Sequence, residues 1–146
     1  MELIFLVKFV ETYCSMEVPK GRSREDIKTR KQIIKNFYAK WIAMHQDKKV
    51  WNKALRAYIY VKFISINETS GQASISYEST LEVLRMAEIM ANATLVKRML
   101  PKPGDMNQKP YLEILVMNYK TAKLVVGKQR TTGEYVQYCI TSMVKK

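Results

Sequence analysis

Alternation of apolar and polar residues between Ala54 and Ile66 is the feature that most constrains the fold. The apolar members of this segment are Ala57, Ile59, Val61 and Phe63. The members between them are cationic or aromatic, namely Arg56, Tyr58, Tyr60 and Lys62. Successive side chains of a β-strand point to opposite faces of its sheet. The pattern therefore predicts a strand with one face toward a core and one face of cations and rings.

A basic amphipathic helix is predicted before that strand, from about Arg24 to Gln46. Ser23 stands at its N-cap position with Asp26 three residues later, which is close to a capping box. Apolar residues recur through the segment at helical spacing, and lysines occupy its other faces. Packing on a sheet is the common reason for this pattern, although a helix lying on a membrane surface shares it.

The remaining elements follow a polar loop from Asn67 to Ser76. Ser79 and Glu82 match an S-x-x-E capping box, which predicts a helix to about Asn92. After the loop Pro101–Asp105, three strands are predicted at Tyr111–Asn118, Lys123–Gly127 and Glu134–Met143, with Gly133 in the last hairpin. We expect an α+β fold, in which an N-terminal helix and a second helix pack on a mainly antiparallel sheet of about four strands.

The chain has the size and composition of one domain, with 146 residues of which 47% are hydrophobic. We expect residues 1–22 to form an N-terminal arm or strand and residues 23–146 to form a single α+β domain. The apolar run from Leu3 to Val10 is preceded by Glu2 in place of a positive charge, and it is too short to span a bilayer. It is predicted to be a buried strand, a docked arm or the tail of an upstream domain, without membrane insertion.

The two cysteines, Cys14 and Cys139, stand far apart and without metal-ligand spacing, so reduced thiols and a cytoplasmic location are expected. The five glycines are scattered singly, which argues against a phosphate-cradling loop, and the single histidine excludes two-histidine zinc motifs. No metal and no cofactor are therefore expected. His45 falls at the end of the predicted first helix, where a structural role is favoured over general-base catalysis.

The formal net charge of +12 predicts an anionic partner, most plainly a nucleic acid. From Lys20 to Lys62 there are thirteen basic and three acidic residues, and from Lys97 to Lys146 there are ten and three. Arg85 is the only basic residue of the acidic segment between them. A basic surface that serves solubility alone is the simpler alternative.

Candidate RNA-binding residues are those that combine cations for phosphate with rings on which unpaired bases stack. They are Arg56, Tyr58, Tyr60 and Lys62 of the alternating segment. The alternatives are an ordinary half-exposed sheet face or aromatic side chains covered by a helix. Lys128 and Arg130 follow in a turn that would either clamp a phosphate or protect an edge strand with charge, and Tyr138 comes after them.

Several segments resemble small domains carried by phages, plasmids and conjugative elements, found alone or attached to large polyvalent proteins. The segments are Val50 to Ile59, Ser65 to Thr69, Ser76 to Leu81, Val125 to Gly127 and Val136 to Thr141. The likeness covers about Arg30 to Thr141. In element order these domains are similar to the barnase, EndoU, colicin-type and RelE-like ribonuclease fold, in which a helical N-terminal part packs on a four-stranded antiparallel sheet that holds the RNA.

That resemblance implies RNA as substrate, with Arg, Lys and Tyr side chains as the active groups. Related nuclease-like groups often carry a histidine where the first strand ends, and this chain has Glu68 and Thr69 there. RelE-like toxins cut RNA without an essential histidine. The candidates that the resemblance adds are Arg56, Lys62, Arg85, Lys128, Arg130 and Tyr138.

The expectation from the sequence is a metal-independent ribonuclease-like domain in which Arg130, Tyr138 and Glu68 carry catalysis. Arg and Lys would stabilise the charge that develops on the phosphate, and Tyr138 or Glu68 would move protons. The alternatives are a non-catalytic RNA- or DNA-binding module, such as a counter-defence or toxin-neutralising protein, and an interaction domain whose apolar N-terminus docks on a protein partner.

Overall fold

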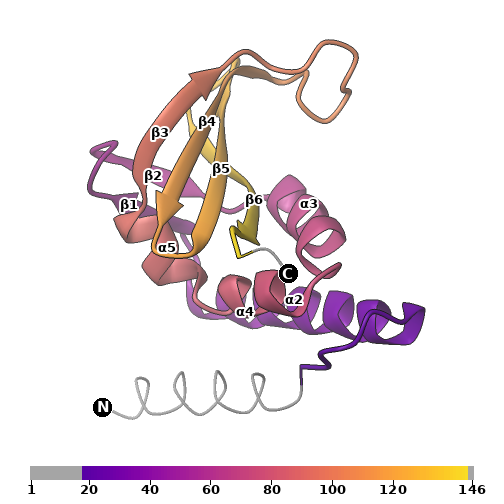
Figure 1. Cartoon of the computed structure of the whole chain (residues 1–146). Coiled ribbons are helices and arrows are strands. Elements are labelled where there is room, and N and C mark those ends of the chain that lie inside the picture. Colours follow the sequence, from indigo (N-terminus) through magenta and orange to yellow (C-terminus); the bar gives the residue numbers. More distant parts are fainter. Residues whose placement is uncertain (1–17, 145–146) are drawn as a thin grey trace.

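A mixed sheet with the strand order β1-β2-β6-β5-β4-β3 organises the chain (Figure 1). The structure is a computed structural model that describes residues 18–144. All neighbouring strands pair antiparallel except β2 and β6, which are parallel. The strands are β1 (Lys49–Asn52), β2 (Ala57–Tyr60), β3 (Thr94–Met99), β4 (Tyr111–Tyr119), β5 (Ala122–Gln129) and β6 (Tyr135–Ser142). The predicted α+β class is confirmed, with six strands in place of about four.

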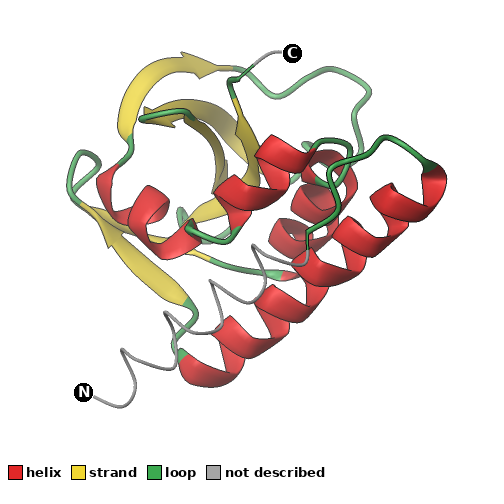
Figure 2. Ribbon diagram, turned by 60° about the horizontal axis from the view of Figure 1, so that its bottom comes forward, coloured by secondary structure: helices red, strands yellow, loops and turns green. Residues whose placement is uncertain are grey.

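The helices gather beneath and beside the strongly curved sheet (Figure 2). They are α2 (Arg24–Met44), α3 (Phe63–Ala73), α4 (Tyr77–Val83) and α5 (Met86–Asn92). The predicted first helix is confirmed with its cap, because Ser23 Oγ accepts a hydrogen bond from Asp26 N at 3.1 Å. None of the helices that the structure describes is long and apolar enough to cross a membrane. Residues 1–17, including Cys14 and the apolar run, lie outside the described residues.

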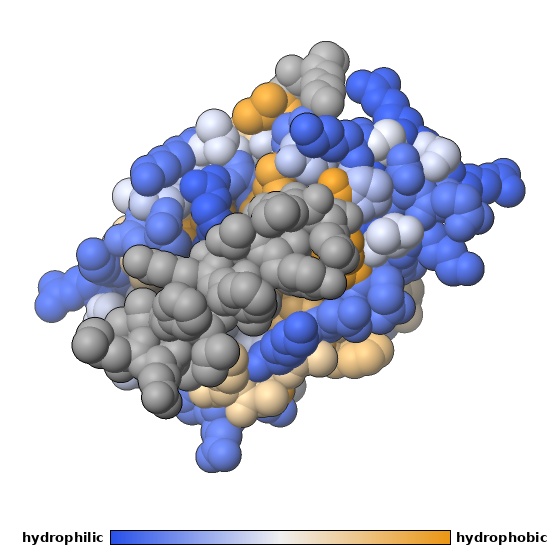
Figure 3. Space-filling view, turned by 90° about the horizontal axis from the view of Figure 1, so that it is seen from below, coloured by the Kyte–Doolittle hydropathy of each residue, from blue (hydrophilic) through white to orange (hydrophobic). Residues whose placement is uncertain are grey.

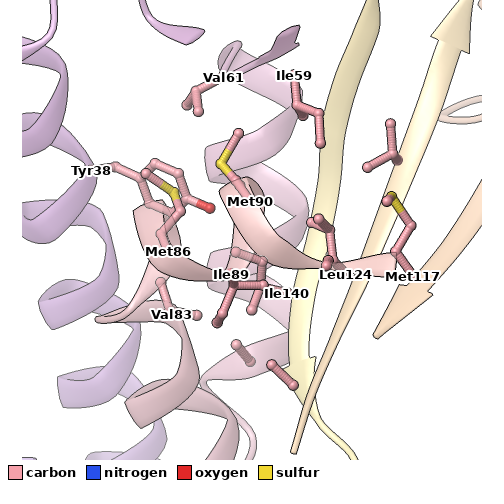
Figure 4. Packing of buried hydrophobic residues seen from close by; sticks show 14 of the residues in the cluster. Tyr38, Ile59, Val61, Val83, Met86, Ile89, Met90, Met117, Leu124 and Ile140 are labelled. Atoms are coloured by element: carbon pink, nitrogen blue, oxygen red, sulfur yellow. The ribbon is translucent and has the colours of Figure 1, made fainter. Parts of the chain in front are cut away.

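The main core fills the space between one sheet face and helices α2 and α5 (Figure 4). Ile59, Leu124 and Ile140 come from three strands of the sheet and are fully buried against Met86 and Met90. Tyr38 of α2 reaches into the same core, where its hydroxyl donates to Gln137 Oε1 of β6. Burial raises the pKa of Tyr38 well above its usual value, so the phenol stays neutral in the core.

A smaller cluster occupies the opposite sheet face. It is built from Tyr111, Ile114, Val136, Tyr138 and Cys139, with Ile64 of α3 packed against it. Gly127 of β5 makes room for this cluster, since a Cβ placed there would lie 2.6 Å from Tyr111 Cδ1. The Tyr111 ring therefore lies directly on the backbone of β5.

Arg30 of α2 joins the helices without an ion pair among the described residues. It is completely buried, and its guanidinium donates to the carbonyl oxygens of Ser74, Pro19, Gly21 and Ile75 at 2.7 to 3.2 Å. A buried charge is tolerated when its hydrogen bonds are made. Arg30 thus holds the segment before α2 against the α3–α4 connection.

The predicted strand from Ala54 to Ile66 is wrong at both ends. A turn in which Arg56 has φ 53° precedes β2, and Ser65 Oγ accepts from Lys62 N at 3.0 Å where α3 begins. Phe63, predicted to face the core, is 80% exposed. The residues that α3 buries are mostly small and polar, namely Ser65, Thr69, Ser70 and Ala73, so hydrophobic periodicity does not reveal this helix.

Two further elements differ from the prediction. Ser76 and not Ser79 caps α4, and the predicted second helix is two helices, interrupted at Leu84 and Arg85. Ser79 Oγ instead accepts from Ser142 N at 2.9 Å, which ties α4 to the end of β6. Strand β3 was not predicted. All its residues are exposed, so they lack the half-buried alternation that marks a strand.

Candidate nucleic-acid interface

Strands β1 and β2 form a hairpin whose outer face carries rings and cations. Trp51 lies opposite Tyr58 and Lys49 lies opposite Tyr60. Lys49 Nζ is 4.2 Å from the centroid of the Tyr58 ring and 5.8 Å from that of Tyr60, and Trp51 packs edge-on against Tyr58. Trp51 is 48% exposed and Tyr58 42%. We call Lys49, Trp51, Tyr58, Tyr60 and Lys62 the aromatic strip.

The cations on and beside the aromatic strip differ in whether they are paired. Arg56 is exposed in the β1–β2 turn. Lys62 is held instead, since its Nζ lies 2.7 Å from Glu134 Oε1 and 2.9 Å from Gln129 Oε1. The hydrogen bond from Lys62 lowers the pKa of Glu134. Unlike Lys62, Lys49 and Arg56 take part in none of the ion pairs found within the described residues.

The strip shares its sheet face with the smaller cluster. Ile59, between Tyr58 and Tyr60, is in the main core, so both tyrosines point to the other face. Tyr60 lies beside Val136 in the parallel pairing of β2 and β6, and Val136 belongs to the smaller cluster together with Tyr138. The strip and Tyr138 therefore occupy one face, opposite the face that α2 and α5 cover.

Tyr138 and Glu68 are in direct contact. The Tyr138 hydroxyl donates to Glu68 Oε1 of α3 at 3.1 Å, and Asn107 Nδ2 donates to the same oxygen at 2.6 Å. Val125 pairs with Cys139 and Val126 with Gln137, so Tyr138 is the extra residue of a β-bulge. A bulge redirects a side chain and is frequent beside functional sites.

Burial and the neighbouring Glu68 both affect the pKa of the Tyr138 hydroxyl. Desolvation, and then Glu68, raise the pKa of Tyr138 well above the usual value of a phenol. The same two causes raise the pKa of Tyr111, whose ring packs edge-on against Tyr138. Tyr138 therefore remains protonated at neutral pH, and its hydroxyl keeps the proton that it shares in the hydrogen bond to Glu68.

Arg130, the third predicted catalytic residue, does not contact this pair. Its backbone N donates to Pro110 O at 2.9 Å, and its Nε lies 3.4 Å from Lys109 O. The loop of residues 100–110 reaches both groups, because Asn107 contacts Glu68 and Lys109 contacts Arg130. The structure thus brings Tyr138 and Glu68 together and places Arg130 at another part of the loop.

Two predicted RNA-binding residues lie away from the strip. Lys128 is paired with Tyr135, which packs against the main core, so it belongs to the opposite sheet face. Arg85 contacts Glu82, which also accepts from Thr121 of the β4–β5 turn. That turn is at the far end of β4 from the Arg130 loop, roughly 30 Å along a strand of nine residues.

Other charged and titratable candidates have structural contacts. His45 is the C-cap of α2, with Nδ1 at 2.9 Å from Trp41 O and its ring stacked on Trp41. Glu82 is buried between Arg85 and Thr121. Within residues 18–144, no group of three or more His, Cys, Asp or Glu side chains is arranged to hold a metal ion.

A second cationic surface lies on α2. Figure 3 views the molecule from below, the side on which α2 lies, and hydrophilic side chains dominate the described surface there. The exposed cations at helical spacing are Arg24, Lys28, Lys31 and Lys35. The net charge is therefore spread over more than one face.

Sequence reasoning missed Lys49, Trp51, Asn107 and Tyr111. Lys49 and Trp51 alternate with Val50 and Asn52 and would have been found had residues 49–52 been recognised as a strand. Asn107 stands in a loop and becomes significant only through its contact with Glu68. No family model matches the chain, and no curated protein and no solved structure matches it significantly.

Proposed function

We propose that the protein binds single-stranded RNA on the aromatic strip. The observation that supports this most directly is the stacked arrangement of Lys49 with Tyr58 and Tyr60 on an exposed sheet face. Exposed rings offer stacking to unpaired bases, worth about 1–3 kcal/mol per base, while cations attract the phosphates. A duplex hides its bases from such rings, so single strands are the preferred ligand.

The test measures fluorescence anisotropy of a labelled single-stranded RNA, its duplex and the corresponding single-stranded DNA. The RNA single strand should bind most tightly, and Tyr58→Ala should weaken its binding by roughly tenfold through lost stacking. Lys49→Gln should reduce the slope of log K against log salt by about 0.7, as expected for one lost phosphate contact.

Tyr77→Ala is the matched control, because Tyr77 is also a tyrosine beside a lysine, with Lys20 Nζ 5.5 Å from its ring centroid, but it lies in α4. It should leave RNA affinity unchanged. Duplex binding as tight as single-strand binding, or an unchanged affinity in folded Tyr58→Ala, would contradict the proposal.

Metal-independent RNA cleavage is the second candidate function, favoured by the contact between Glu68 and Tyr138. In this reaction Glu68 takes the proton of a 2′-hydroxyl, whose oxygen forms a bond to phosphorus. The bond from phosphorus to the 5′-oxygen breaks, and Tyr138 protonates the leaving oxygen. The products are a 2′,3′-cyclic phosphate and a 5′-hydroxyl end. The phosphate must enter between the two side chains, which separates their hydrogen bond.

Incubation of the protein with RNA in EDTA, followed by mapping of new ends, tests this reaction. Cleavage should persist in EDTA and stop when the cut site carries a 2′-deoxyribose. Glu68→Gln and Tyr138→Phe should each lower the rate roughly 10²-fold, while His45→Ala leaves it intact. A folded protein that binds RNA and yields no new ends would limit the function to binding.

A further inference from the structure

The loop of residues 100–110 and Arg130, directly after β5, line an open hollow of about 390 Å³. Its lining comes from two parts of the chain, which are the loop itself and Arg130. The lining residues are Pro101, Lys102, Pro103, Gly104, Asp105, Met106, Lys109 and Arg130. We call this space the loop hollow. Its volume is within the usual range of small-molecule sites.

Positive charge dominates the loop hollow. Lys102, Lys109 and Arg130 contribute three cations against the single carboxylate of Asp105. The ion pairs found within residues 18–144 involve none of these three cations. Asp105 Oδ1 accepts a hydrogen bond from the backbone N of Asn107 at 2.9 Å, which holds this carboxylate oxygen against the loop backbone. The hollow is therefore suited to an anion.

Hydrogen bonds within the loop order the backbone that carries these cations. Lys102 N donates to Gln108 Oε1 at 2.7 Å, and Asp105 N donates to Lys102 O at 3.1 Å. The backbone N of Arg130 donates to Pro110 O at 2.9 Å, which attaches the end of β5 to the loop. A site whose backbone is already ordered loses less entropy when it binds a ligand.

Apolar surface completes the lining. Pro101 and Pro103 provide rigid apolar rings, and Met106 is 72% exposed at the rim. A free phosphate ion would use only the cations. A nucleotide would use both the cations and the apolar surface, with its phosphate at the cations and its base against the proline and methionine side chains.

We propose that the loop hollow is a nucleotide-binding site that recognises a 5′-phosphate. The ligand is a free nucleoside monophosphate or the 5′-phosphorylated end of an RNA strand. The site goes beyond RNA binding on the aromatic strip, because it uses other residues and recognises a terminal 5′-phosphate, which base stacking on the strip does not require. Arg130 is its main phosphate donor, since a guanidinium can bind phosphate through two parallel hydrogen bonds.

The first experiment titrates the protein with 5′-AMP, adenosine and inorganic phosphate by calorimetry and by amide chemical shifts. 5′-AMP should bind saturably and shift residues 101–109, and adenosine and phosphate should each bind at least tenfold more weakly. Equal binding of adenosine would overturn the role of the phosphate. Absence of saturable 5′-AMP binding would overturn the site.

Substitution then locates the site. Arg130→Gln should weaken 5′-AMP binding roughly ten- to hundredfold, as expected for a lost charged hydrogen-bond donor. Arg24→Gln removes the same charge from an exposed position of α2 and should have no effect. Unchanged binding in folded Arg130→Gln, or equal weakening in Arg24→Gln, would contradict the assignment.

Two further comparisons identify the source of the phosphate and separate this site from the strip. A 5′-phosphorylated RNA should bind more tightly than its 5′-hydroxyl form if the ligand is a strand end, and equally if the ligand is a free nucleotide. Tyr58→Ala should lose RNA affinity and retain 5′-AMP affinity. Loss of 5′-AMP binding in Tyr58→Ala would place the nucleotide on the strip and overturn the loop hollow.

Discussion

The two faces of the sheet differ in what covers them. Helices α2 and α5 seal one face with apolar side chains, and a buried hydrogen bond joins Tyr38 of α2 to Gln137 of β6 within it. The other face, which we call the open face, carries the smaller cluster and the exposed rings along β1 and β2. It also carries the carboxylate of Glu68 in contact with the buried Tyr138. The comparison indicates that stability comes mainly from the covered face, and the RNA binding and cleavage that we propose would both take place on the other.

The largest expected effect tests this division directly. Leu124→Ala removes a fully buried side chain from the covered face and should lower the free energy of unfolding by about 2–5 kcal/mol. Tyr58→Ala on the open face should lower it by less than about 1 kcal/mol, because the ring is already 42% exposed. Denaturant unfolding of both variants provides the measurement. Equal losses would show that the open face is also a structural core.

A second prediction tests how closely the smaller cluster packs on the backbone of β5. Gly127→Ala forces a Cβ to within 2.6 Å of the buried Tyr111 ring and should cost about 1–3 kcal/mol of stability. Gly71→Ala is its control, since a Cβ there meets nothing within 4 Å and α3 should gain up to about 1 kcal/mol. Thermal denaturation should therefore shift in opposite directions for the two variants.

A pH titration tests burial on the open face. Desolvation, reinforced by Glu68, raises the pKa of Cys139 from 9.0 to about 12. Between these values the unfolded thiol loses its proton while the folded one retains it, so stability falls as pH rises above about 9. The loss should reach about 1–2 kcal/mol by pH 10. In Cys139→Ala the decline over this pH range should be smaller by that amount, and an identical decline would show a solvated thiol.

The smallest expected effect concerns Phe63, which the alternating pattern predicted to be in the core. Because its side chain is 80% exposed at the start of α3, Phe63→Ala should change the free energy of unfolding by less than about 0.5 kcal/mol. Ile59→Ala, at a truly buried position of the same pattern, should cost about 2–5 kcal/mol. A large effect at Phe63 would restore the original strand assignment.

Local patterns predicted several elements correctly, because they depend on neighbouring residues. The capped helix α2 and the strands β4, β5 and β6 follow from capping chemistry and from period-two alternation. Tyr58 and Tyr60 were also placed correctly on the face opposite Ile59. The strip was incomplete because β1 is only four residues long and its pattern is correspondingly short.

The sequence by itself determined the α+β class, the positive charge and the cation–ring face of β2. The tertiary structure alone decided which distant residues meet. Glu68 and Tyr138 come into contact only because α3 packs on β6, and Arg30 finds its four carbonyl partners only because the α3–α4 connection lies against α2. The physical reason is that residue type and spacing report local preference, whereas hydrogen bonds between distant segments depend on how whole elements pack.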